Sequence, residues 1–204
     1  MKLRVSEHEL GLSWVVEEPL QRASHALAAD GRVWFIDPVA DDAVLARAAE
    51  LGEPAGVIRL LDRHGRDCDS LAASLGVPLY SLPDAIPDSP FEVVRLLHVP
   101  GWHEQALWWP ERRALVVAEV VGSSSHYTLG GDRTAGIHPM VRLLPPGSLR
   151  RYQPEHLLLG HGDPLHGPEA TTALHEAYAR SRSDLPRMLL AAPALLGAAK
   201  GRWG

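Results

Sequence analysis

Cysteine is nearly absent from this sequence, and dense basic runs and long apolar runs are missing as well. Cys68 is the single cysteine in 204 residues, which excludes an intramolecular disulfide and a zinc knuckle built on thiolates. The formal net charge is -5, and no basic patch is available to hold nucleic acid by its phosphates. No segment has the length and apolar character of a membrane span or a secretory leader. We therefore expect a cytoplasmic protein without a nucleic-acid or membrane partner.

The composition suits one compact domain. Hydrophobic residues make up 46% and charged residues 22% of the chain, and this length supports one core rather than two. We expect a single domain over residues 1–204, ending in a helix over about 184–199. Pro193 and Gly197 interrupt the apolar run of that helix. Its apolar side chains are expected to pack on the domain, and the alternative is a contact in a homodimer.

The most informative stretch is a strand, a polar turn and a helix in succession. Residues 57–61 are typical of a buried strand, and Leu71 and Leu75 recur at helical spacing before Gly76 ends the helix. Acidic, basic and histidine side chains fill the turn between them. In layered α/β proteins, ligands usually bind where strands end, so this turn is the expected edge of a site.

The chain before this stretch predicts a hairpin and a helix. Asp30-Gly31 lies between two strand-like runs and can adopt the positive φ angles of a tight turn. The second run, Val33 to Ile36, ends at Asp37. Asp41 or Asp42 can cap a helix that leads back to the central strand.

The chain after this stretch predicts more strands and a closing helix. Strands are expected over 91–99, 106–109 and 114–121, followed by a loop over 122–136. For residues 137–144, helical and extended structure both remain open. A short strand then ends in Gly-His161-Gly-Asp-Pro, and Pro168 opens an amphipathic helix.

Four of these pieces resemble the metallo-β-lactamase superfamily in their order, over about residues 23 to 167. In that superfamily the turn after the central strand carries H-x-H-x-D-H. Here His64 stands at the second histidine, Asp62 at the first, Arg66 at the aspartate and Asp67 at the last histidine. The resemblance implies an α/β fold, a four-layer αββα sandwich.

The other pieces supply the remaining ligands that this resemblance implies. His103 follows Pro100-Gly101, Glu119 stands at a strand end where the superfamily has a metal-bridging aspartate, and His161 takes the place of the last histidine. One metal position would then use Asp62, His64 and His103, and the second would use Asp67, Glu119 and His161. Histidine and carboxylate ligands suit one divalent ion, zinc or else manganese or iron.

Arg66 opposes a two-metal centre because a guanidinium is permanently charged and cannot be a ligand. It is expected to pair with Asp67, Asp69 or Glu119 instead. We therefore favour a degenerate member of the fold, without the usual two-metal hydrolysis and of unknown substrate or binding role, with one divalent metal or none and an unknown small-molecule ligand. The alternative is a single-metal hydrolase of an ester, thioester, amide or phosphodiester, with Glu119 or Asp67 assisting proton transfer.

Overall fold

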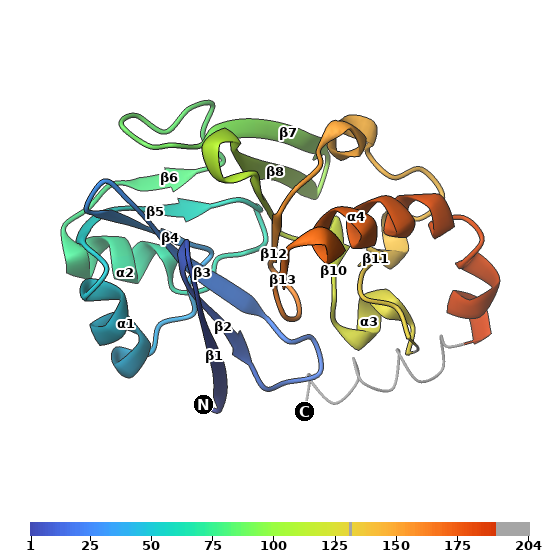
Figure 1. Ribbon diagram of the computed structural model, residues 1–204, viewed down its shortest axis with the longest axis horizontal. Helices are drawn as coiled ribbons and strands as arrows, with labels where there is room; N and C mark the ends of the chain where they lie inside the picture. The colour runs from blue at the N-terminus through green and yellow to red at the C-terminus, as the bar shows by residue number, and fades with distance from the viewer. Residues whose placement is uncertain (131, 191–204) are drawn as a thin grey trace.

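The computed structural model describes residues 1–130 and 132–190. Two mixed β-sheets face each other, and helices cover their outer sides (Figure 1). This is the αββα arrangement that the sequence predicts.

The first sheet has six strands in the order β1-β2-β3-β4-β5-β6. Pairing is antiparallel from β1 to β4 and parallel from β4 to β6. The strands are β1 (Leu3–His8), β2 (Gly11–Val16), β3 (Ala23–Ala29), β4 (Arg32–Ile36), β5 (Glu53–Arg59) and β6 (Leu79–Ser81).

The second sheet has five strands in the order β13-β12-β9-β8-β7. Only β9 and β12 run parallel; the other pairs are antiparallel. The strands are β7 (Glu92–Val99), β8 (Trp102–Trp109), β9 (Ala114–Val117), β12 (His156–Leu159) and β13 (Leu165–His166).

Helices α1 (Asp42–Ala49), α2 (Cys68–Leu75) and α4 (Pro168–Arg180) cover the outer faces of the two sheets. α1 and α2 bury Val44, Cys68 and Leu71 in a core with the first sheet. α4 buries Ala173 and Leu174 in the larger core, which also fills the space between the sheets. No helix within residues 1–130 and 132–190 is long and apolar enough to cross a membrane.

Local sequence signals explain several of these boundaries. The predicted turn between β3 and β4 forms with positive φ at Asp30 and Gly31, 50° and 74°. The Asp41 carboxylate caps α1 by accepting hydrogen bonds from two backbone N–H groups, and α2 ends at Gly76 with a φ of 65°. These are positions where the chain needs a capping side chain or a left-handed residue.

Other boundaries differ from the prediction. The central strand covers Glu53–Arg59 rather than 57–61. It ends at Arg59 because the N–H of Leu60 donates to the Asp37 carboxylate instead of continuing the ladder. The expected loop over 122–136 contains a short helix, α3 (Ser125–Thr128), between β10 (Val121–Gly122) and β11 (Gly136–Ile137).

Short 3-10 helices occupy the chain between β11 and β12. Within residues 137–144, the structure has the end of β11 and a 3-10 helix at Pro139–Val141. A second 3-10 helix covers Gly147–Arg151. Residues 191–199 of the predicted C-terminal helix lie outside the described residues.

Candidate functional site

Four strands end around one pocket. Asp37 follows β4, the turn with His64 and Arg66 follows β5, Glu119 follows β9, and His161 follows β12. The pocket has a volume of about 330 Å³. Its lining residues are Leu20, Arg22, Arg63, His64, Arg66, Glu119 and His161.

Arg66 is the central side chain of this pocket. Its Nη1 donates to the backbone carbonyls of Ala23 and Asp37, and its Nη2 donates to the carbonyl of Gly160 at 3.1 Å. Nη2 also lies 3.4 Å from Nε2 of His64. The backbone of Arg66 is left-handed, with a φ of 36°. Three carbonyls from three separate segments thus hold the guanidinium, and none of the carboxylates expected from the sequence pairs with it.

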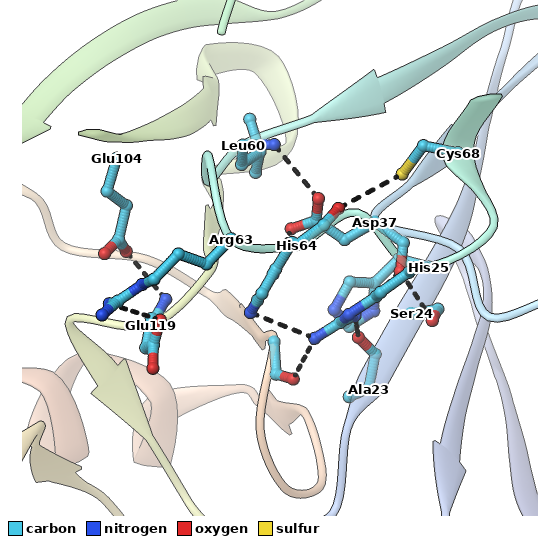
Figure 2. A network of polar contacts seen from close by, with 12 residues as sticks. Ala23, Ser24, His25, Asp37, Leu60, Arg63, His64, Cys68, Glu104 and Glu119 are labelled. Carbon is cyan, nitrogen blue, oxygen red and sulfur yellow. Dashed lines mark hydrogen bonds and ion pairs between the residues drawn. The ribbon is translucent and has the colours of Figure 1, made fainter. Parts of the chain in front are cut away.

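His64 is held by a buried carboxylate. Its Nδ1 lies 3.0 Å from Oδ2 of Asp37, whose Oδ1 accepts from the N–H of Leu60 (Figure 2). Burial alone would raise the pKa of Asp37, but the neighbouring His64 and Arg66 outweigh it and lower that pKa. Burial, reinforced by Arg66, lowers the pKa of His64. Asp37 is therefore ionised and His64 neutral, so Nδ1 carries the proton and the lone pair on Nε2 faces Nη2 of Arg66.

His161 has the same tautomer for a different reason. Its Nδ1 lies 3.0 Å from the carbonyl oxygen of Leu20, which can only accept, so Nδ1 carries the proton. Its Nε2 is buried without a hydrogen-bond partner. Burial and the charge of Arg66 lower the pKa of His161 well below its ordinary value. The His64 and His161 rings lie 5.5 Å apart, so the pocket contains two neutral imidazoles beside one cation.

Glu119 faces the pocket but is already paired. It forms an ion pair with Arg63 at 3.0 Å, and Nε2 of His138 lies 3.4 Å from its other oxygen. The guanidinium of Arg63 also lies 4.5 Å above the ring of Trp102. These contacts engage the carboxylate that the sequence assigns to proton transfer or metal binding.

Glu104 supports this wall from behind. Its Oε1 accepts from the backbone N–H groups of Glu119 and Val120, and its Oε2 accepts from the indole of Trp102. Burial raises the pKa of Glu104 to about 7, although the three donors favour its ionised form. Glu104 directly follows His103 and is not among the site residues predicted from the sequence.

The other predicted ligands lie away from the pocket. Asp62 is exposed and accepts from the backbone N–H of His103. The ring of His103 stacks on that of His98 at 4.1 Å, and both line another pocket, of about 460 Å³. Asp67 accepts from the backbone N–H of Ala40. Of the six predicted ligands, the pocket brings together His64, Glu119 and His161.

Cys68, at the start of α2, is a buried thiol. Burial raises its pKa to about 12, and its Sγ lies 3.7 Å from the carbonyl oxygen of His64. A thiol in this state is protonated at neutral pH and is a poor nucleophile.

The donor set does not fit a two-metal centre. Within residues 1–130 and 132–190, no three histidine, cysteine, aspartate or glutamate side chains are arranged to hold a metal ion. Arg66 lies beside both pocket histidines, where its charge would repel a divalent ion. The predicted ligand set as a whole remains a prediction.

Asp37 is the main residue of the site that is not among the ligands predicted from the sequence. It stands directly after β4, the strand that ends before the turn with His64. A carboxylate behind a histidine commonly fixes the tautomer of that histidine. An aspartate at the end of the neighbouring strand was therefore the signal that could have identified Asp37 as the partner of His64.

Known proteins share the fold rather than the sequence. No family model and no curated protein matches the chain. The solved structure of the DIM-1 metallo-β-lactamase matches with a TM-score of 0.61 and 13% identity, over 89% of this chain and 98% of that chain. VMB-1 matches with a TM-score of 0.59 and 12% identity, over 89% and 97%. A metallo-β-lactamase from Hirschia baltica matches with a TM-score of 0.52 and 11% identity, over 87% and 98%. The chain therefore has the metallo-β-lactamase fold.

Proposed function

We propose that this protein is a non-hydrolytic form of the fold that binds a small anion in the Arg66 pocket. The observation that carries the proposal is the position of Arg66. Its guanidinium, anchored by backbone carbonyls, lies beside His64 and close enough to His161 for its charge to act there. The resemblance implies metal ligands in this place. A fixed organic cation there takes the place of a metal as the positive charge of the pocket.

The charges of the lining residues favour an anion. Arg22 pairs with Glu18, and Arg63 pairs with Glu119. In the described part of the chain, Arg66 forms no ion pair with a carboxylate. The pocket thus keeps one positive charge that is balanced mainly by carbonyl dipoles and by Asp37 beyond His64. A guanidinium attracts carboxylates and phosphates through its permanent charge. The Nη atoms of Arg66 already donate to protein acceptors, whereas its buried Nε has no hydrogen-bond partner among the described residues.

The two histidines restrict which anions are suitable. Their Nε2 atoms carry lone pairs, and that of His161 has no partner. A buried acceptor without a donor costs free energy, so the preferred ligand is an anion that also carries an O–H or N–H group. Hydrogen phosphate has both features, whereas sulfate has no proton at neutral pH.

Calorimetric titration with inorganic phosphate and with sulfate, at the same ionic strength and pH 7.5, tests the proposal. We expect phosphate to bind more tightly than sulfate. Arg66→Met should weaken phosphate binding by about tenfold or more, since a charge-assisted hydrogen bond contributes about 1.5–3 kcal/mol. The matched control is Arg95→Met, because Arg95 pairs with Asp84 on the exposed surface. Equal phosphate binding by the wild type and Arg66→Met would refute the proposal.

A single-metal hydrolase is the second candidate, favoured by the two oriented imidazoles. Asp37 and the carbonyl of Leu20 fix the His64 and His161 tautomers so that both Nε2 atoms carry lone pairs, which is how metal-binding histidines are usually held. That of His161 has no partner, and that of His64 lies 3.4 Å from Nη2 of Arg66. Elemental analysis after purification without chelator tests this candidate. It predicts about one metal equivalent in the wild type that is lost in both His64→Ala and His161→Ala.

Arg66→Asp separates the two candidates. If Arg66 takes the place of a metal, the wild type binds no zinc and Arg66→Asp gains up to about one equivalent, because a carboxylate joins the two imidazoles. If the wild type already binds zinc, Arg66→Asp should change the affinity rather than create the site.

A further inference from the structure

A second cluster of titratable groups lies outside the pocket, between the first hairpin and β12–β13. It contains four histidines from four strands or their ends, together with one serine and one glutamate. We call it the histidine cluster, and its members are His8, Glu9, Ser13, His25, His156 and His166.

Three contacts in the cluster tie the first sheet to β12–β13, and each uses an imidazole. Glu9 pairs with Nε2 of His156 at 2.8 Å. The rings of His8 and His166 lie 4.9 Å apart. Nε2 of His25 lies 3.1 Å from the carbonyl of Leu159. Protonation of this cluster therefore acts directly on the junction between the two sheets.

The carbonyl of Leu159 determines the proton positions in one half of the cluster. A carbonyl only accepts, so His25 donates from Nε2 and its Nδ1 has the lone pair. Ser13 must then donate to His25 and accept from Nε2 of His8. Neutral His8 is left with a lone pair on Nδ1, which is buried and has no partner.

In the other half of the cluster, the Nδ1 atoms of His156 and His166 face each other and have room for one proton between them. His156 and His166 are register partners of β12 and β13, and their Nδ1 atoms lie 2.8 Å apart. His156 donates from Nε2 to Glu9, so in the neutral pair His166 donates to His156. One extra proton can be shared without loss of this bond. A second would leave two N–H groups facing each other, beside the ring of His8.

The segment between β12 and β13 also builds the Arg66 pocket. It supplies the carbonyl of Gly160 to Arg66, and it places His161 in the pocket wall. A further link, between Arg4 and Asp163, holds this segment to β1 without a histidine. Movement of the β12–β13 hairpin would thus displace two parts of the pocket.

We propose that the histidine cluster is an acid-sensitive clasp, closed when its imidazoles are neutral, that holds β12–β13 and the Arg66 pocket in place. The effect on the pocket rests on the anion-binding function proposed above, whereas the clasp itself does not. A proton relay to the pocket is a poorer interpretation, because the chain of donors ends at the carbonyl of Leu159.

The direction of the pH effect follows from the pKa values. Burial, followed by the charges of His166 and His156, lowers the pKa of His8 to about 4. Burial, followed by His156, lowers the pKa of His166, although Glu9 opposes the change. Groups with lowered folded pKa values stabilise the closed form fully above about pH 6.5, and this stability is lost as the pH falls towards about 4. Arg4 and Asp163 also face the junction, and the charges of Arg66 and Asp37 act on His25 from the pocket side.

Hydrogen exchange of the full chain at pH 7 and pH 5, without phosphate and with a chelator present, tests the clasp. After correction for intrinsic exchange, we expect amides of β1 and β13 to lose about tenfold in protection relative to those of β8. The double variant His8→Gln/His166→Gln keeps hydrogen-bonding groups that do not titrate, so it should lose much less. His98→Gln, an exposed histidine outside the cluster, is the control and should behave as the wild type.

Two results would overturn the clasp: wild-type protection that falls equally in β1, β13 and β8, or an undiminished local loss in the double variant. If the double variant does not fold, NMR titration of the wild-type histidines decides. His8 must titrate well below its unfolded value of about 6.5, and titration near 6.5 would remove the coupling to the loss of protection and overturn the clasp. Phosphate titration of the double variant at pH 5 then tests the pocket. A clasp that opens without any phosphate binding at either pH would refute the anion-binding function and leave the clasp intact.

Discussion

The Arg66 pocket and the corner formed by Asp62 and His103 start from the same strand end but differ in almost every physical respect. In the pocket, Asp37, His64 and His161 are 2%, 7% and 6% exposed, and hydrogen bonds to Asp37 and to the carbonyl of Leu20 set the tautomers of the two histidines. At the corner, Asp62 is exposed and accepts a single hydrogen bond from the backbone of His103. Residues that are neighbours in a sequence motif, such as Asp62 and His64, therefore do not necessarily share a site.

The reason lies in where each side chain finds its partner. The backbone N–H of Asp62 donates to the carbonyl of His103, which ties Asp62 to the start of β8. Two residues later, His64 turns inward to the carboxylate of Asp37. A metal centre built from all three would require those existing contacts to break.

The largest expected difference between the two regions is in stability. Asp37→Ala removes the acceptor of Leu60 and His64 and leaves Arg66 without its nearest negative charge. We expect the free energy of unfolding to fall by about 3 kcal/mol or more. Asp62→Ala, its matched control at the corner, should cost about 1 kcal/mol or less. Urea denaturation measures both, and similar losses would contradict the contrast in burial.

The pH dependence of unfolding gives the next difference. Burial, followed by the charge of His8, lowers the pKa of His25, a member of the histidine cluster, to about 3. Its stabilising contribution is present above the unfolded value of about 6.5 and is lost as the pH falls. His25→Gln should reduce the slope of unfolding free energy between pH 4 and 6 by about 1.4 kcal/mol per pH unit. The exposed His98→Gln is the control, and an unchanged slope in His25→Gln would show that this imidazole is not buried in its neutral form.

The smallest difference concerns two arginine pairs. Arg63 pairs with Glu119, whose side chain is 17% exposed, and lies over Trp102. Arg95 pairs with Asp84, and these side chains are 78% and 81% exposed. Arg63→Ala should cost about 1 kcal/mol, whereas Arg95→Ala should be indistinguishable from the wild type in the same denaturation experiment. A larger loss in Arg95→Ala would reverse the comparison.

Much of the fold could be predicted because it depends on local signals. The Asp30-Gly31 turn, the cap at Asp41 and the stop at Gly76 act over a few residues. The position of His161 at the end of a short apolar strand was predictable for the same reason. The end of the central strand was not, because it depends on a carboxylate 23 positions earlier in the chain.

The candidate site was predictable only in part. His64, Glu119 and His161 come together as expected, but Arg66 binds carbonyls of Ala23, Asp37 and Gly160 rather than a carboxylate. Backbone carbonyls have no signature in a sequence, so no pattern could have named these partners. The histidine cluster likewise joins residues 8 and 166, which only the packing of the two sheets brings together.

Residue type and local spacing account for the succession of strands, turns and helices, and for an arginine where metal ligands were expected. The tertiary structure alone decided which side chains share a pocket, which tautomers the histidines adopt and which groups lose their water. Those properties arise from desolvation and from contacts between segments that are distant in the chain. They exist only once the two sheets have packed against each other.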